Sequence, residues 1–197
     1  MCYANDDLKL FYINIPKCAT NWGKIVFSNT LGWRETNYHN DTLLKKGYKP
    51  IVFLRDPKER WATGMAEFFS RYGFNTSILL IKLVKQDVAL QLINATMQFD
   101  EHTAEQIMFL DGVDTDNAVW FKVDQNLNQS LANYLEDILG AKLVMPDWKP
   151  YETYGNKKKI KEFFLENIDK FKQFPKHYKL DMELYDSVKY YNREDKD

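Results

Sequence analysis

"FYINIPKCATNWGK", residues 11–24, joins an apolar run to a polar loop and then to a segment of helical character. The apolar, alternating residues 11–15 predict a strand that ends at a proline. Lys17 follows, and four small or polar residues separate it from a Trp-Gly pair. In α/β proteins a strand, a tight loop and a helix in this order bind phosphate, because amide groups at the start of the helix point at the anion. The stretch therefore predicts an α/β fold with an anion-binding loop, although it lacks the glycines of the usual phosphate loop.

Strand-like and helix-like segments alternate over the rest of the chain. We expect strands at residues 8–15, 34–39, 49–56 and 118–123. We expect helices at residues 20–31, from Pro57 onward, and at 77–97, 128–139, 156–171 and 178–191. This alternation favours parallel βαβ units, so the predicted fold class is α/β, with a parallel β-sheet flanked by helices. Because the sequence shows no internal repeat, low-complexity tract or linker, residues 1–197 are expected to form a single domain.

The composition is that of an ordinary globular protein: 197 residues, of which 45% are hydrophobic and 28% charged. The formal net charge is -1, so bulk electrostatics give no argument for nucleic acid or an anionic membrane as a partner, and any anion site must be local. The two cysteines, Cys2 and Cys18, do not suggest a disulfide framework. Neither a signal peptide nor a membrane-spanning segment is recognisable, and we expect a cytoplasmic protein without membrane insertion.

The loop after the first predicted strand has the donors that an anion needs. Backbone amides from about Ala19 to Trp22 would point at the ligand, and Thr20 and Asn21 add side-chain donors. Lys17 adds a mobile point charge. A solvated lysine on an ordinary turn is the alternative, and the loop alone leaves both interpretations open. The spacing of a Walker A loop is absent, and Cys18 is expected to pack in the loop rather than to do thiol chemistry.

A second stretch, "FLRDPKERWATG" at residues 53–64, favours the anion-binding interpretation. Arg55 comes at the end of a predicted strand, and Asp56 with the following proline opens the next helix. The guanidinium of Arg55 is well shaped for a terminal phosphate, and Thr63 follows within the first two helical turns. We expect Arg60 to pair with Asp56 or Glu59 instead. Two anion sites at the ends of two parallel strands imply a ligand with two separated phosphates.

Both stretches resemble sequence motifs of the sulfotransferases that use 3′-phosphoadenosine 5′-phosphosulfate (PAPS). "IPKCATNW", residues 15–22, is similar to their 5′-phosphosulfate loop, and "VFLRDPKERWATG", residues 52–64, is similar to their 3′-phosphate motif. The order and separation match the carbohydrate and membrane-type branch of the family. More loosely, "FDEHTAEQIMFL", residues 99–110, resembles a His-x-x-x-Gln segment of that branch, and "YKLDMELYDSV", residues 178–188, resembles its C-terminal Tyr-x-x-Asp helix.

The resemblance implies a sulfotransferase whose sheet is related to that of P-loop nucleotide kinases, with PAPS as donor, 3′,5′-bisphosphoadenosine (PAP) as product and no metal. It assigns donor binding to Lys17, Cys18, Ala19, Thr20, Asn21, Trp22, Arg55 and Thr63. Three positions depart from the usual motifs. Ala19 replaces a common glycine, Asn21 replaces serine or threonine, and Thr63 replaces the usual serine. These substitutions keep small size or hydrogen-bonding capacity.

Sulfuryl transfer needs a cation at the leaving oxygen and a proton acceptor for the attacking hydroxyl. Lys17 is the candidate cation. In related glycan sulfotransferases the base comes from the interval between the two phosphate motifs, where His39 and Glu35 lie. His102 belongs to the His-x-x-x-Gln segment and is a further candidate. We rank His39 first, His102 second and Glu35 third, and expect His177 to be a surface or structural residue.

By family analogy the acceptor is a carbohydrate hydroxyl, with a small alcohol, a phenol or a peptide tyrosine as alternatives. Two other functions stay open. A small kinase of the same broad fold would need a glycine loop and a magnesium site, and neither is visible in the sequence. A nucleotide-binding module would keep the donor loops without a working base.

Overall fold

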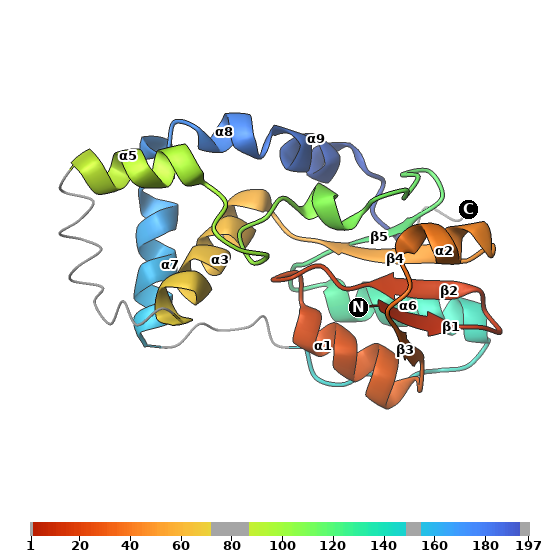
Figure 1. The fold of residues 1–197 in the computed structure, drawn as a ribbon. Coiled ribbons are helices and arrows are strands. Elements are labelled where there is room, and N and C mark those ends of the chain that lie inside the picture. The colour runs from red at the N-terminus through yellow and green to blue at the C-terminus, as the bar shows by residue number, and fades with distance from the viewer. Residues whose placement is uncertain (1, 72–86, 149–154, 194–197) are drawn as a thin grey trace. The chain divides into compact units, whose positions relative to one another are not determined.

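The computed structural model describes residues 2–71, 87–148 and 155–193, which form an α/β structure (Figure 1). The described residues fall into two compact units. The first, here called the sheet unit, comprises residues 2–55, 107–148 and 187–193. The second, the helical unit, comprises residues 56–71, 87–106 and 155–186. A short 3-10 helix, η2 (Gln106–Phe109), lies where the chain passes from the helical unit to the sheet unit.

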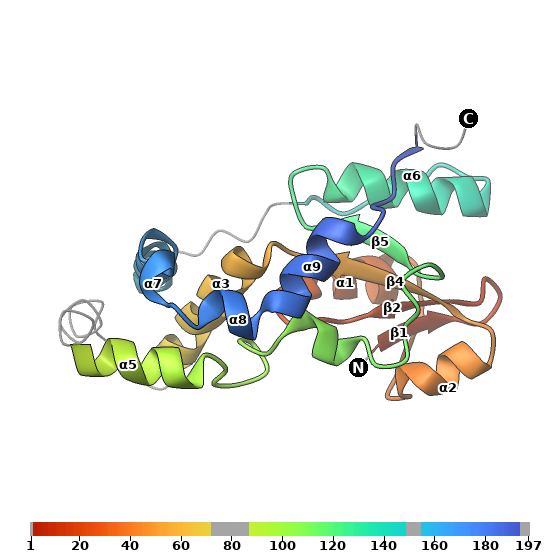
Figure 2. The same cartoon turned by 90° about the horizontal axis from the view of Figure 1, so that it is seen from above.

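Five strands of the described residues form one sheet in the order β3-β1-β2-β4-β5, most of which Figure 2 shows in sequence. The strands are β1 (Cys2–Asn5), β2 (Leu10–Ile13), β3 (Arg34–Thr36), β4 (Lys49–Leu54) and β5 (Val119–Lys122). The pairs β2–β4 and β4–β5 are parallel, as predicted, whereas β1 is antiparallel to both β2 and β3. The sheet is therefore mixed, and the prediction of a purely parallel sheet was wrong.

The error comes from β1, a strand that the sequence analysis did not predict. A tight turn connects β1 to β2, and the Asn5 side chain fixes it by accepting bonds from the amides of Asp7 at 3.0 Å and Leu8 at 2.8 Å. Such a turn returns the chain directly beside itself, which makes the pair antiparallel. The four strands that were predicted are confirmed, each shorter than expected.

The helix predicted at residues 20–31 is present, but it changes from an α-helix to a π-helix along its length. It begins as α1 (Thr20–Lys24) and continues as the π-helical stretch η1 (Ile25–Thr30), in which the Leu31 amide bonds the Val26 carbonyl at 3.0 Å. α6 (Leu127–Leu139) ends at Gly140 with φ 64, which confirms the predicted stop. α2 (Asn40–Lys45) was not predicted.

Aromatic side chains fill the space between one face of the sheet and its helices. Tyr12 of β2 and Phe53 of β4 lie on this face with ring centroids 4.7 Å apart. Phe27 of η1 stacks on Tyr12 at 4.5 Å, and Tyr134 of α6 contacts Phe121 of β5 at 5.6 Å. α1, η1 and α6 therefore cover this face and hold the loop after β2 against the sheet.

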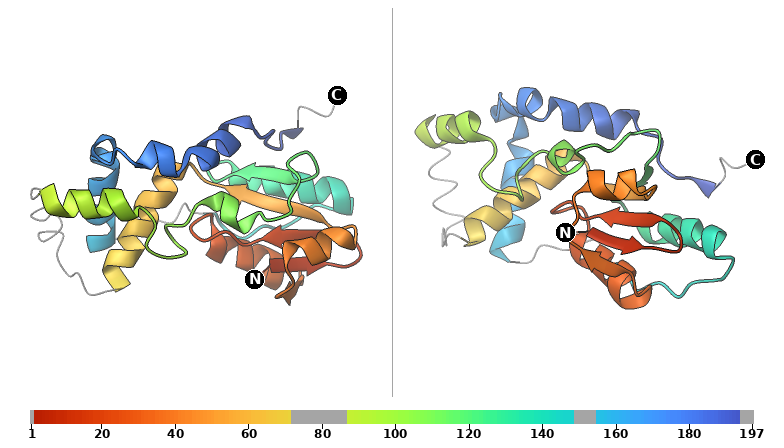
Figure 3. Two further views of the ribbon diagram at one scale, coloured as in Figure 1. Left: turned by 45° about the horizontal axis from the view of Figure 1, so that its top comes forward. Right: turned by 45° about the vertical axis from the view of Figure 1, so that its right-hand side comes forward.

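The helical unit is built around Trp61 of α3. Its helices are α3 (Pro57–Arg71), α5 (Asp87–Thr96), α7 (Asn156–Glu166), η3 (Ile168–Lys170), α8 (Phe174–His177) and α9 (Lys179–Ser187). The Trp61 ring lies 5.1–5.3 Å from the rings of three phenylalanines, Phe164, Phe171 and Phe174. α7 lies beside α3 (Figure 3), where Lys157 pairs with Glu67 at 2.9 Å.

Two predictions about helices fall in this unit. The helix opened by Asp56 and Pro57 is confirmed, because the Asp56 carboxylate accepts the Glu59 amide at 3.0 Å as an N-cap does. Of the helix predicted at residues 77–97, the part up to residue 86 lies outside the described residues, and the remainder is α5. In the described ranges, none of the helices combines the length and apolar character needed to cross a membrane.

Candidate functional site

Four strands of the sheet unit run in one direction and end at the same edge. β1 is antiparallel to both of its neighbours, so β3 runs parallel to β2, and β4 and β5 follow in the same sense. Lys17 comes after β2, Arg55 after β4 and His39 after β3. In open α/β sheets ligands bind outside the carboxyl ends of the strands. This edge, here called the carboxyl edge, is the candidate site.

The loop after β2 takes a backbone shape that usually requires glycine. Lys17 has φ 67 and Ala19 has φ 59, both in the left-handed region. A residue with a Cβ takes this conformation at a cost of roughly 1–2 kcal/mol, and such strain persists where surrounding contacts enforce it. The Ile15 carbonyl accepts bonds from the Cys18 amide and the Thr20 hydroxyl, both at 3.1 Å. The loop is therefore a glycine-type loop built without glycine, and the Thr20 hydroxyl, a predicted ligand donor, contributes to its shape.

Arg55 connects the two motif loops. Its Nη1 donates to the carbonyl oxygen of Lys17 at 3.3 Å, across 38 positions of sequence. The register explains the contact, because Ile13 pairs with Val52 and each loop residue follows a few positions later. The Lys17 loop and Arg55, predicted to bind one ligand, are thus neighbours on the carboxyl edge.

Below the loop, α1 approaches the sheet at Gly23. A Cβ at this position would lie 2.7 Å from the Tyr12 hydroxyl oxygen, so only glycine fits over Tyr12. Among the described residues that buried hydroxyl has no hydrogen-bond partner. Burial raises the pKa of Tyr12 well above its ordinary value, with Cys18 and Tyr3 adding to the rise. Cys18 is fully buried beside it, as expected for a packing residue.

The other predicted donor residues have different surroundings. Asn21 is exposed, whereas the Trp22 ring is buried and donates from Nε1 to the Pro146 carbonyl at 3.4 Å. Trp148 lies 5.1 Å from Trp22 and donates to the carbonyl of Asp124, which follows β5, at 2.8 Å. Trp148 is therefore a half-buried aromatic residue near the carboxyl edge. The sequence analysis missed it, because a tryptophan in an irregular segment gives no periodic signal.

Two candidates for the base belong to the sheet unit. His39 is exposed at the N-cap of α2, just beyond the carboxyl end of β3, and makes no capping bond with its side chain. Glu35 lies in the middle of β3, opposite Tyr3. It is therefore on a face of the sheet and not at the carboxyl edge. β1 separates β3 from β2, which puts their axes about 10 Å apart. Of these two residues, the geometry favours His39.

His102 and Thr63 belong to the helical unit. His102 is buried, its Nδ1 lies 2.9 Å from an Asp100 carboxylate oxygen, and its amide donates to the other oxygen at 2.9 Å. Its Nε2 lies 3.9 Å from the Glu101 carboxylate. The Thr63 hydroxyl donates to the Glu59 carbonyl of its own helix at 2.7 Å. Each side chain therefore has a local structural contact.

The two loosely matched segments contact each other inside the helical unit. Tyr178 donates to the carbonyls of Thr103 and Met97, the latter at 3.2 Å, and the buried Asp181 accepts the Gln106 amide at 2.7 Å. Burial raises the pKa of Tyr178 far above its ordinary value. These residues hold the segment before η2 in place, which is a structural role.

Arg60 joins the same network. It is 1% exposed, and its guanidinium donates to the carbonyls of Ala104 and Glu101, the latter at 3.4 Å. The expectation that Arg60 is structural rather than a phosphate ligand fits these bonds, although the expected partners were the carboxylates of Asp56 or Glu59.

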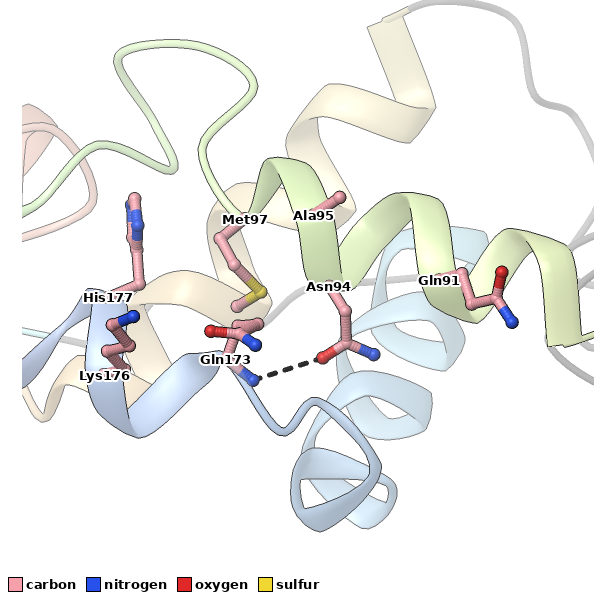
Figure 4. A pocket seen from close by; sticks show the side chains of 7 residues that line it. All are labelled: Gln91, Asn94, Ala95, Met97, Gln173, Lys176 and His177. Carbon is pink, nitrogen blue, oxygen red and sulfur yellow. Dashed lines mark hydrogen bonds between the residues drawn. The ribbon is translucent and has the colours of Figure 1, made fainter.

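A cavity of about 700 Å³ lies in the helical unit between α5 and α8 (Figure 4). It is lined by Gln91, Asn94, Ala95, Met97, Gln173, Lys176 and His177. The Asn94 amide bridges its two sides, accepting from the Gln173 amide and donating to the Lys170 carbonyl, both at 3.3 Å. Within the part of the chain that the structure describes, the buried Nε2 of His177 has no hydrogen-bond partner. Of the predicted functional residues, none lines this cavity.

Across the described ranges, no cluster of three or more histidine, cysteine, aspartate or glutamate side chains has the arrangement of a metal site. No family model, curated protein or solved structure matches this chain.

Proposed function

We propose that the protein is a PAPS-dependent sulfotransferase that moves a sulfuryl group to a hydroxyl, with a glycan as the acceptor class. The observation that carries the proposal is the bond from Arg55 to the Lys17 carbonyl. It makes neighbours of two loops whose sequences resemble the two phosphate motifs of that family, at the edge of the sheet where ligands bind in α/β proteins.

In this proposal the loop amides of residues 19–22 and the Lys17 ammonium hold the 5′-phosphosulfate, and Arg55 holds the 3′-phosphate. A guanidinium has five N–H donors in a fixed plane, so a bond from Nη1 to Lys17 is compatible with a phosphate contact elsewhere on the group. Thr63, predicted as a second phosphate contact, belongs to the helical unit, where its hydroxyl donates to the Glu59 carbonyl at 2.7 Å.

The chemistry follows from these positions. The acceptor oxygen attacks sulfur while the bond from sulfur to the bridging oxygen breaks, and negative charge develops on that oxygen. Lys17 neutralises this charge, and positioning of the two substrates lowers the barrier further. His39, on the same edge, takes the hydroxyl proton.

A thermal-shift series on the intact chain with PAP, ATP and AMP tests the donor class. We expect the largest stabilisation from PAP, since a ligand that binds the native state stabilises it by RT ln(1 + L/Kd), where L is the free ligand concentration, so at equal concentrations the tighter ligand gives the larger shift. Preference for ATP would contradict the proposal and favour a kinase. A second assay, with labelled PAPS and a panel of sugars, separates a transferase from a binding module, which would bind PAP without turnover.

A further inference from the structure

We propose that Arg55 is a positioning residue, which keeps the Lys17 loop in its anion-binding shape and thereby links the two phosphate subsites. The inference takes its ligands from the proposed function, but the contact on which it is based lies within the loop itself. A residue that only binds phosphate contacts the phosphate group of the bound nucleotide. A positioning residue also holds the protein loop beside it.

The peptide unit between Lys17 and Cys18 is held at both ends. Its carbonyl accepts the Arg55 guanidinium at 3.3 Å, and its N–H donates to the Ile15 carbonyl at 3.1 Å. Rotation of this peptide plane, which changes ψ of Lys17 and φ of Cys18, would break both bonds and alter the shape of the loop. The plane also sets the direction of the amides that follow, from Ala19 onward.

Without the Arg55 contact we expect the loop to relax to another backbone conformation. Lys17 and Ala19 both carry a Cβ and both have positive φ, so the observed shape is disfavoured unless contacts enforce it. The Arg55 bond is such a contact, and it comes from a different strand. Occupation of Arg55 by a 3′-phosphate would fix the guanidinium and, through it, the loop that receives the 5′ group.

AMP distinguishes positioning from direct binding, because it has a 5′-phosphate and no 3′-phosphate. By calorimetry, we expect Arg55→Ala to weaken PAP binding about 10–100-fold, the scale of a charge-assisted bond, and AMP binding about 5–10-fold. A residue that only binds the 3′-phosphate would leave AMP affinity unchanged. AMP affinity within about twofold of wild type would therefore overturn the inference.

Ala19→Gly separates loop shape from loss of charge. Glycine takes positive φ without steric cost and leaves the charge of the site unaltered. If Arg55 acts by holding the loop, Arg55→Ala/Ala19→Gly should recover most of the AMP affinity lost in Arg55→Ala. If the loss is electrostatic, the second substitution should recover none of it, and the positioning role is rejected.

A ligand-free measurement keeps the inference testable if wild type binds neither nucleotide, an outcome that would reject the proposed function. Arg55→Ala should speed amide hydrogen exchange at Cys18, whose N–H bonds Ile15, and leave exchange in β2 and β4 unchanged. Unchanged exchange at Cys18 would contradict the positioning role. Faster exchange throughout the strands together with a lower unfolding temperature would also contradict it, since Arg55 would then stabilise the whole unit.

Discussion

Lys17 is the residue on which the proposed chemistry depends most. It lies in the strained loop beside Arg55 and is partly exposed, so its ammonium can reach a ligand at the carboxyl edge. If it neutralises the leaving oxygen, its contribution is larger in the transition state than in the ground state. We expect Lys17→Ala to lower kcat at saturating PAPS by roughly 10²–10³-fold, with a smaller loss of donor affinity.

Lys24→Ala is the matched control for Lys17, because Lys24 is an exposed lysine on α1. It should leave kcat near the wild-type value. A kcat of Lys17→Ala within about twofold of wild type would remove the catalytic role, since twofold is well below 1 kcal/mol. Weaker donor binding with unchanged kcat would mean that Lys17 only binds.

Gly23 and Tyr12 form a steric pair that a double-mutant cycle can isolate. Gly23→Ala places a Cβ against the Tyr12 hydroxyl and should lower the free energy of unfolding by about 1–3 kcal/mol. Tyr12→Phe removes a buried hydroxyl that has no hydrogen-bond partner in the described ranges, and it should be neutral or stabilising. In the Tyr12→Phe background, Gly23→Ala should destabilise nearly as much, because the ring carbons Cε1 and Cζ, both 2.8 Å from the added Cβ, remain in phenylalanine. A clearly smaller effect in that background, measured by urea unfolding, would show that the hydroxyl alone is the obstacle.

The raised pKa of Glu105 predicts that the stability of the folded protein depends on pH. Burial and the nearby Asp181 carboxylate raise the pKa of Glu105, and His177 opposes the rise. The folded state thus holds the Glu105 proton more tightly than the unfolded chain. This stabilisation is complete below the unfolded pKa and is lost as pH rises through the folded pKa. Glu105→Gln should therefore be more stable than wild type at about pH 7 and lose less stability between about pH 4 and pH 7.

Urea unfolding at several pH values measures this difference. Glu166→Gln, which removes an exposed carboxylate on α7, is the matched control and should not show the gain. A Glu105→Gln stability curve parallel to that of wild type would contradict the predicted effect of burial.

Among the secondary-structure elements, the sequence predicted best where a local signal and the tertiary environment agree. The Asp-Pro start of α3 and the Gly140 end of α6 are set by capping residues that act within one turn. β4 is a continuous apolar run, and it is buried on both faces. β1 has four residues and depends on its pairing with β2 and β3, so no local pattern marks it.

The cap of α3 gives a prediction for one element. Asp56→Ala removes the acceptor of the Glu59 amide and should lower the free energy of unfolding by about 1 kcal/mol. Asp56→Asn keeps a side-chain oxygen at this position and should retain most of the stability. Chemical denaturation of the two variants checks the prediction, and equal stability of Asp56→Ala and wild type would mean that the cap contributes nothing.

For the whole molecule, the sequence predicted neighbours along the sheet better than contacts between distant segments. The contact of Arg55 with the Lys17 loop follows from the parallel pairing of β2 and β4, because parallel strands end at one edge. Arg60 bonds residues 41 and 44 positions away, and Asp181 and Tyr178 bond residues 75 to 81 positions away. Periodicity carries no signal for such distant partners. The sequence motif likewise gives no sign that the Thr20 hydroxyl bonds the Ile15 carbonyl within its own loop.

The distribution of charge over the molecule predicts how the donor is held. The proposed site meets the donor's negative charges with side-chain cations, Lys17 and Arg55, and with loop amides, so the residues themselves supply what a divalent metal supplies in nucleotide kinases. PAP affinity and sulfuryl transfer should therefore be the same before and after dialysis against EDTA. Calorimetry with PAP measures binding, and a labelled-donor assay measures transfer. Loss of either on chelation, with recovery on adding magnesium, would contradict the proposed site and favour a kinase-type reaction.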